Sequence, residues 1–189
     1  MANSKAPGSA NAYRRQKQIE DSLYANLLMK PYTSVSVSDL CLQLEISRKS
    51  FYNYFPDKDS CFRSLIRRKL RQCSLTITSG ARESKSDDDV IAVFLNFWRQ
   101  ERGFLDVIVR NNLLTMLFDQ CIRFLREEDK AILEYLDTPQ LETDDYVLAC
   151  FVNVHITMIL QWHKSGFDIP VEEMIPKYKR LFYEPLLNV

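Results

Sequence analysis

The segment SVSDLCLQLEISRKSFYNYFP, which begins at Ser36, places two helix-start signals one after the other. Ser36 is a candidate N-cap, and Asp39, three residues later, can accept a hydrogen bond from the backbone N–H of the cap and so complete a capping box. Ser47 is the candidate cap of a second helix, which Pro56 ends because helical geometry is unfavourable for the residue before a proline. Two short capped helices with a tight turn between them predict a helix-turn-helix.

The second of these helices is expected to bury one face and to expose a basic and aromatic one. Phe51 and Phe55 are four residues apart and are expected in the core. The opposite face suits a DNA groove, because Arg or Lys can read guanine, Asn can read adenine, and Tyr or Lys can donate to phosphate. The alternative, an ordinary solvated surface helix, is disfavoured by the paired caps and the aromatic pattern. The candidate DNA-contacting residues are Ser36, Ser47, Arg48, Lys49, Ser50, Tyr52, Asn53, Tyr54 and Lys58.

Residues 13 to about 75 resemble the DNA-binding domain of the TetR family of bacterial one-component regulators. The family typically has a Phe/Leu-Tyr-x-x-Phe-x-x-Lys stretch, which Phe51, Tyr52, Phe55 and Lys58 fill here. The resemblance implies a homodimer that binds a roughly palindromic DNA operator and that often releases it when a small molecule enters the other domain.

The same stretch follows the family in one position and departs from it in another. Ser36 stands where the family commonly has Thr. Glu45 occupies a turn position where the family usually has Gly, so the turn geometry can differ from that of the family. A carboxylate at this place would repel DNA if it pointed toward the phosphates.

Charge is distributed unevenly along a chain that is neutral as a whole, with 25 Lys plus Arg and 25 Asp plus Glu. Residues 1–75 contain 13 basic and 6 acidic side chains, a net +7, so the remainder carries 12 basic and 19 acidic side chains, a net −7. A basic first domain and an acidic second one are typical of a protein whose first domain alone binds phosphates.

Only 4 glycines and 7 prolines occur among 189 residues, and sustained alternation of apolar and polar residues is almost absent, so we expect an all-α protein. The expected organisation is a disordered tail over residues 1–12, a three-helix helix-turn-helix domain over 13–75, and a helical ligand-binding and dimerisation domain over 76–189. A polar link is expected over residues 79–89. Helices are expected near residues 12–30, 37–44, 48–54, 57–78, 88–101, 104–126, 128–137, 143–164 and 171–187.

Two apolar regions of the second domain suggest roles. The first, residues 90–125, is apolar on more than one face, and it could line a pocket for a small apolar effector or form plain core. Its candidate ligand-binding residues are Phe94, Phe97, Trp98, Asn112, Met116 and Phe118. The second resembles the penultimate helix of the TetR family, which pairs with the last helix in the dimer, and Gly166 is expected to end it. Its candidate interface residues, which could instead be buried within one subunit, are Val147, Phe151, Val154, Met158 and Trp162.

Enzymatic, metal and membrane roles find little support in the sequence. His155 and His163 are eight residues apart, a spacing that does not place two metal ligands side by side, and no catalytic or phosphate-loop motif occurs. The five cysteines form no Cys-x-x-Cys pair, so we expect buried thiols and neither metal nor cofactor, with redox sensing through Cys73 or Cys121 as a minor alternative. Without an apolar signal core or a long apolar span, a cytoplasmic protein with no membrane partner is expected.

These observations predict a homodimeric repressor that binds duplex DNA and is released by a small-molecule effector. Two alternatives stay open. The chain could be a DNA-binding regulator without a small-molecule effector, or a helical small-molecule-binding protein whose helix-turn-helix is vestigial.

Overall fold

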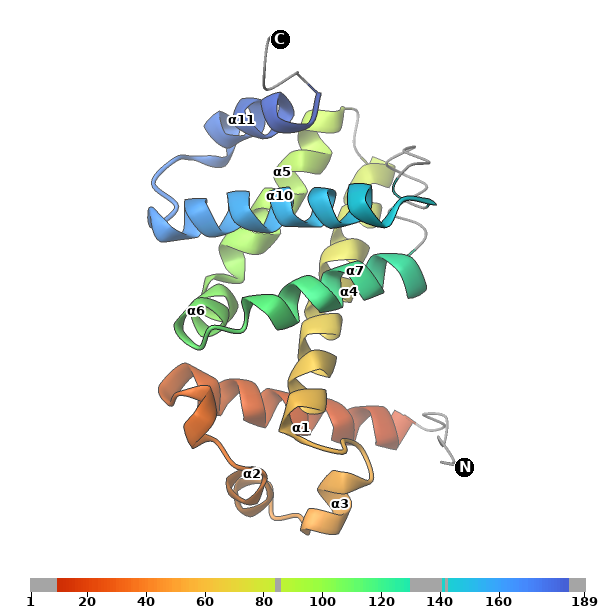
Figure 1. The fold of residues 1–189 in the computed structure, drawn as a ribbon, viewed down its shortest axis with the longest axis vertical. Coiled ribbons are helices and arrows are strands. Elements are labelled where there is room, and N and C mark those ends of the chain that lie inside the picture. The colour runs from red at the N-terminus through yellow and green to blue at the C-terminus, as the bar shows by residue number, and fades with distance from the viewer. Residues whose placement is uncertain (1–9, 84–85, 130–140, 142, 184–189) are drawn as a thin grey trace. The chain divides into compact units, whose positions relative to one another are not determined.

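The computed structural model describes residues 10–83, 86–129, 141 and 143–183, which are almost entirely helical (Figure 1). Within these ranges no strand occurs, so the expected all-α class is confirmed. The elements are α1 (Ala10–Met29), the 3-10 turn η1 (Tyr32–Ser34), α2 (Val37–Gln43), α3 (Arg48–Tyr52), α4 (Lys58–Glu83), α5 (Asp87–Gln100), α6 (Arg102–Arg110), α7 (Leu114–Glu127), α10 (Asp145–Lys164) and α11 (Val171–Tyr183).

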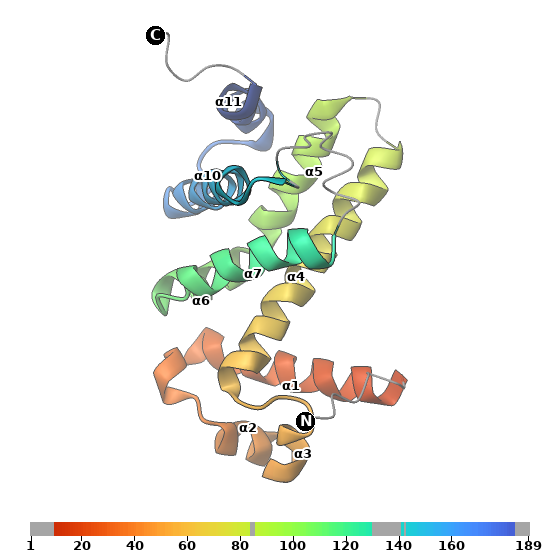
Figure 2. The same ribbon diagram turned by 45° about the vertical axis from the view of Figure 1, so that its right-hand side comes forward.

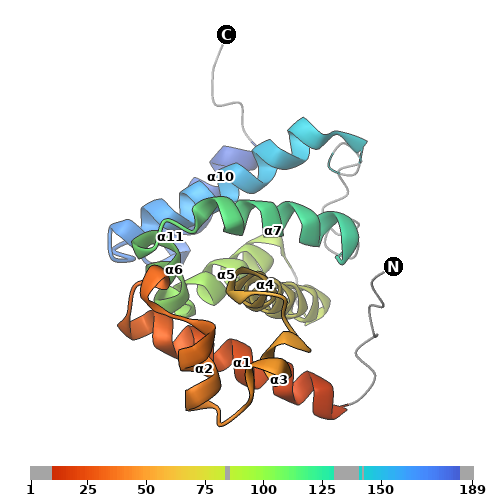
Figure 3. The same cartoon turned by 60° about the horizontal axis from the view of Figure 1, so that its bottom comes forward.

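The chain forms two compact units, Met1–Arg68 and Lys69–Val189, whose boundary falls inside α4. In unit 1, α2 and α3 lie side by side next to α1 (Figure 3). Their apolar faces form one small core, because each short helix can bury only the residues of one face. The buried apolar side chains include Ile19, Leu23, Leu27, Val35, Leu40, Phe51, Phe55, Phe62, Leu65 and Ile66.

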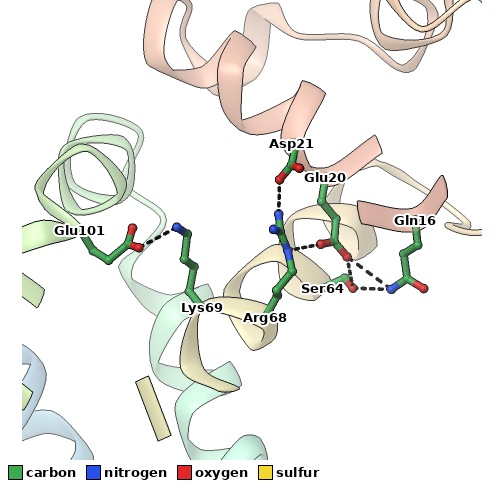
Figure 4. A network of polar contacts seen from close by, with 7 residues as sticks. All are labelled: Gln16, Glu20, Asp21, Ser64, Arg68, Lys69 and Glu101. Atoms are coloured by element: carbon green, nitrogen blue, oxygen red, sulfur yellow. Dashed lines mark hydrogen bonds and ion pairs between the residues drawn. The ribbon is translucent and has the colours of Figure 1, made fainter. Parts of the chain in front are cut away.

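Polar contacts tie the helices of unit 1 together around a buried carboxylate (Figure 4). The guanidinium Nε of Arg68 lies 2.6 Å from Glu20, which is 2 % exposed, and its Nη2 lies 2.5 Å from Asp21. Ser64 donates to the same Glu20 carboxylate at 2.7 Å and accepts from Gln16 at 3.0 Å. A buried carboxylate needs this set of partners, since removing one of them would leave an uncompensated charge.

Unit 2 begins at Lys69, whose ammonium pairs with Glu101 at 2.8 Å (Figure 4). In this unit α10 packs on α7 and α11 packs on α5, as the turned view shows (Figure 2). The fully buried Phe104, Leu105 and Ile108 of α6 and the fully buried Leu95 of α5 contribute to the core.

Two expected boundaries in unit 2 are wrong. The helix expected over residues 104–126 is broken into α6 and α7, because Asn112 adopts φ 54°, a left-handed conformation that ends a helix. The polar link expected over residues 79–89 is mostly helical, since α4 continues to Glu83 and α5 starts at Asp87. The helix expected over residues 128–137 and the tail expected over residues 1–12 lie largely outside the described residues.

Gly80 lies in the part of α4 that runs through the expected link, and it faces Val93 of α5. A Cβ atom added at Gly80 would lie 3.0 Å from Cγ2 of Val93 in α5, closer than side chains normally approach. The glycine therefore permits close packing of α4 on α5, and it does so inside a helix, where glycine would otherwise be unfavourable.

Candidate nucleic-acid interface and cavity

Local sequence signals build the helix-turn-helix as expected. Ser36 accepts a hydrogen bond from the backbone N–H of Asp39 at 3.1 Å, and the Asp39 carboxylate accepts one from the backbone N–H of Ser36 at 3.0 Å, which completes the capping box. Ser47 accepts from the backbone N–H of Ser50 at 3.0 Å and caps α3. Both predicted caps are confirmed, and both hold their serine hydroxyls at helix starts.

The turn between α2 and α3 depends on Glu45, which adopts φ 53°. The backbone N–H of Glu45 donates to Leu42 at 3.2 Å, and that of Ile46 donates to Cys41 at 3.0 Å. This pair of bonds is the Schellman motif, whose left-handed residue is usually glycine because a Cβ atom is unfavourable there. The turn therefore has the geometry that a glycine would give, although its left-handed residue is an exposed glutamate.

The outward face of α3 is exposed as the sequence predicts. Phe51 is fully buried and Phe55 is 4 % exposed, whereas Lys49, Tyr52 and Asn53 are exposed, with Tyr52 at 52 %. The Phe51 ring contacts the Tyr52 ring edge-on at 5.5 Å between centroids, which steadies the exposed phenol against the core. The exposed face thus carries the ammonium of Lys49, the phenol of Tyr52 and, at the end of the helix, the amide of Asn53.

Arg48 and Ser50 also lie at the start of α3. The guanidinium of Arg48, which is exposed, donates to the hydroxyl of Ser38 in α2, a residue that sequence reasoning did not single out. Ser50 and Tyr54 are half-buried.

The side chain of Lys58 makes its contacts within its own domain. Its ammonium donates to the backbone oxygens of Tyr32 at 2.6 Å and Val35 at 2.8 Å, and it lies 4.1 Å from the centroid of the Tyr32 ring. Desolvation lowers the pKa of Lys58 below its usual value. The ammonium therefore holds the segment before α2, and the phosphate contact expected of Lys58 stays a prediction.

A cavity of about 410 Å³ lies in unit 2 among α4, α5, α7, α10 and α11. Among the six candidate ligand-binding residues, Phe94 and Trp98 line it. Phe97 instead lines a separate surface hollow beside α4. The lining is mainly apolar and includes Cys73, Cys121, Phe124, Phe151, Ile159 and Leu160.

Three candidate ligand-binding residues are placed elsewhere. Asn112 is exposed and closes a second Schellman motif, since its N–H donates to Val109 at 3.3 Å and the N–H of Leu113 donates to Ile108 at 3.0 Å. Its role is to end α6, for which asparagine is suited because it tolerates the left-handed conformation. Met116 and Phe118 are half-buried on α7 and do not line the cavity.

His155 and Tyr178, which the sequence did not single out for a site, are among the polar residues of the lining. His155 Nδ1 lies 2.8 Å from the carbonyl oxygen of Phe151, and Nε2 lies 2.7 Å from the hydroxyl of Tyr178. A carbonyl only accepts, so Nδ1 carries the proton and Nε2 accepts from the phenol. Burial lowers the pKa of His155 to about 4, which keeps the ring neutral. His155 and Tyr178 are 23 residues apart in the sequence, so no local sequence pattern indicates that they are in contact.

Two of the candidate dimer residues are packing residues of their own subunit. Trp162 is 2 % exposed, its indole N–H donates to the oxygen of Ile169 at 2.9 Å, and its ring packs on Phe167 with centroids 4.9 Å apart. Phe151 lines the cavity and packs on His155 with centroids 4.1 Å apart. The Trp162 ring is thus covered by its own chain, whereas Phe151 is half-buried and faces the cavity.

The other three candidate dimer residues differ in exposure. Val147 is 37 % exposed, Val154 is half-buried, and Met158 is 8 % exposed. Val154 and Met158 line a shallow groove between α10 and α11. Gly166, at φ 79°, ends α10 in a third Schellman motif, as its position in the sequence predicts.

The cysteines in the described part of the chain are free, and four of the five are buried. Burial raises the pKa of Cys121 to about 12 and raises that of Cys73 well above its usual value. Both thiols are therefore protonated at neutral pH and poorly reactive. In the described ranges no group of three or more His, Cys, Asp or Glu side chains is placed to hold a metal ion.

Comparison with known proteins identifies the amino-terminal region. Residues 26–65 match the family model of bacterial regulatory proteins of the tetR family. The solved structure of the fatty acid degradation regulator FadR from Bacillus halodurans superposes with a TM-score of 0.61 over 97 % of this chain and 98 % of that chain, at 14 % sequence identity. No curated protein sequence matches the chain. The resemblance seen in the sequence is thus confirmed over residues 26–65, which match the DNA-binding region of the tetR family, and the chain as a whole shares the fold of the FadR structure.

Proposed function

We propose that this protein is a homodimeric repressor that binds a palindromic DNA operator through α3 and releases it when a small molecule occupies the cavity of unit 2. The observation that carries the proposal is the exposed face of α3, where Lys49, Tyr52 and Asn53 stand on a helix fixed by the buried Phe51 and Phe55. A face of this kind can enter the major groove, with Asn53 or Lys49 at base edges and Tyr52 at a phosphate.

Self-association through α10 and α11 is supported by the surface of α10. This helix is apolar enough in length and composition to resemble a membrane span, yet only 28 % of the residues in its most apolar window are buried. An exposed apolar helix face of a globular protein usually marks an interaction site. In place of the half-buried Phe151 and the buried Trp162, the exposed residues Val147, Cys150 and Thr157 form the proposed dimer face, which recurs at helical spacing.

The cavity supports a small-molecule effector. Its volume of about 410 Å³ lies in the range of ligand pockets, and its apolar lining includes a polar contact between His155 and Tyr178. The FadR protein with the same fold is described as a regulator of fatty acid degradation, which makes a hydrophobic metabolite a reasonable effector for this chain as well.

Two other interpretations are weaker. A regulator without a small-molecule effector would leave the cavity without a role, and it predicts that no small apolar compound raises the melting temperature. A vestigial helix-turn-helix rested on Glu45, but the backbone there forms the same motif that a glycine would form.

The decisive experiment is selection of bound sequences from random duplex DNA with the full chain. The expected result is an inverted repeat bound with an affinity that falls steeply as salt rises, because phosphate contacts release counterions. Recovery of no enriched sequence, together with salt-independent retention of DNA, would contradict the proposal.

A further inference from the structure

The amino-terminal half of α1 carries a second basic surface in unit 1, in addition to the exposed face of α3. Arg14 is exposed and Arg15 is half-buried. The two acids of α1, Glu20 and Asp21, are both paired with Arg68 (Figure 4). In the described part of the chain, neither Arg14 nor Arg15 has an acidic side chain within ion-pair distance. Their two guanidinium groups are therefore available to an anion outside the domain.

The contacts between α1 and α2 fix the direction of Arg15. The hydroxyl of Ser22 in α1 donates to the side chain of Gln43 in α2 at 3.1 Å, so this face of α1 is turned toward the helix-turn-helix. Arg15 precedes Ser22 by seven residues, or about two helical turns, and so lies on the same face. Asn11 and Gln18, which are exposed, share this face because they lie four residues before Arg15 and three after it.

This face of α1 lies on the side of unit 1 that holds α3. Figures 1 and 3 both show α3 nearer than α2 to the amino-terminal end of α1. A helix in the major groove has a phosphate backbone on each side of it, because the groove is only about 12 Å wide. Donors on α1 next to α3 can therefore reach one of these backbones while α3 contacts the bases.

We propose that the amino-terminal half of α1 is a second DNA-contacting surface, in which Arg14 and Arg15 bind backbone phosphates beside the groove that α3 enters. Asn11 and Gln18 supply further donors on the same surface. This inference rests on the proposed DNA-binding function. It adds a contact that does not depend on base sequence, because phosphate contacts set the position of a protein on the duplex and carry no sequence information.

The salt dependence of DNA binding tests the contact on the full-length protein, with a duplex of random sequence as the probe. Arg15→Gln should reduce the slope of log affinity against log salt concentration by about one, and the double variant Arg14→Gln/Arg15→Gln by about two. Lys17→Gln is the matched control. It removes the same charge from an exposed position two residues away, but Lys17 is five residues from Ser22 and so lies on a different face. Its slope should equal that of the wild type.

Two further measurements separate a phosphate contact from base recognition and from a structural role. The double variant should select the same base sequence from random DNA as the wild type, whereas Asn53→Ala should not. Ethylation of phosphates beside the recovered half-sites should weaken the wild type but not the double variant. The melting temperature of the double variant should stay within about 2 °C of the wild type, because the two arginines have no paired acid to lose.

Three outcomes would overturn the inference: a wild-type slope in the double variant, an equal reduction by Arg15→Gln and Lys17→Gln, or unchanged DNA binding with lost binding to phosphatidylglycerol vesicles. The last result would assign the surface to an anionic membrane. Failure here is distinguishable from failure of the proposed function. If Lys49→Met reduces the slope and the double variant does not, α3 keeps its role and only the α1 surface is lost. Absence of any duplex binding would remove both.

Discussion

The ammonium of Lys58 lies 2.6 Å from the carbonyl oxygen of Tyr32, 26 residues away in the sequence. Together with the bond to Val35 it fixes the chain just before the capping box of α2. The cation that fills the family's Lys position is thus an internal tie of the helix-turn-helix domain, whereas the exposed Lys49 is the cation that faces outward.

Replacing the two lysines should therefore affect different properties, stability in one case and DNA binding in the other. Lys58→Met is expected to lower the free energy of unfolding by about 2 kcal/mol, because it leaves two carbonyls without a charged donor. Lys49→Met is expected to change stability by less than about 0.5 kcal/mol and to weaken DNA binding with a salt slope reduced by about one. Urea unfolding and gel shifts at several salt concentrations measure the two effects. Identical behaviour of the two variants would contradict the assignment.

Glu45→Gly is expected to stabilise the protein by about 1 kcal/mol, because φ 53° is unfavourable for a residue with a Cβ atom and acceptable for glycine. Glu45→Ala is the matched control, since it removes the carboxylate but keeps the Cβ atom. If the carboxylate also repels phosphates, both variants should bind DNA more tightly, while only the glycine variant melts at a higher temperature. A glycine variant no more stable than the alanine variant would show that the turn is unstrained.

Gly80→Ala should destabilise the protein despite the better helix propensity of alanine, because the new Cβ atom would lie 3.0 Å from Cγ2 of Val93. The test is a double-mutant cycle. In a Val93→Ala background the space is open, and Gly80→Ala should then become stabilising by up to about 1 kcal/mol. If Gly80→Ala changed stability in the same direction in the wild type and in the Val93→Ala variant, a close contact between α4 and α5 would be contradicted.

His155 should make stability depend on acid pH. Its pKa is about 4 in the folded protein, against 6.5 for a histidine in water, so the unfolded chain takes up a proton at a higher pH than the folded one. Stability is unaffected by this group above about pH 6.5 and falls by up to about 1.4 kcal/mol per pH unit between pH 6.5 and 4. Denaturant unfolding of the wild type and of His155→Gln should diverge over this range. If the free energies of unfolding of the two proteins change in parallel with pH over this range, the histidine is accessible to protons in the folded state.

Thr157→Arg tests the proposed dimer face, because Thr157 is exposed on α10. A buried, unpaired cation in the interface should convert a dimer into a monomer in analytical ultracentrifugation. Thr115→Arg makes the same substitution at an exposed position of α7 and should leave the dimer intact. Dissociation by both variants, or by neither, would argue against this face.

Features of the helix-turn-helix that depend on neighbouring residues could be predicted from the sequence. The capping box of Ser36 and Asp39, the Ser47 cap and the inward Phe51 and Phe55 all follow from spacings of four residues or fewer. The Asn111–Asn112 pair that separates α6 from α7 was also a readable local signal, since asparagine often ends a helix in the left-handed conformation. The apolar run around the pair favours one continuous helix, which is why the break is not part of the prediction.

The all-α class, the helix-turn-helix and the end of α10 at Gly166 can therefore be predicted from the amino-acid sequence, because caps and helical periodicity act over one or two turns. The folded chain was needed to show that Lys58 bonds within its own domain, that Phe151 faces a cavity, and that His155 meets Tyr178 there. These contacts join side chains that lie far apart in the sequence or on different faces of a helix. Their formation depends on how helices pack, and packing depends on the shape of all the partners together.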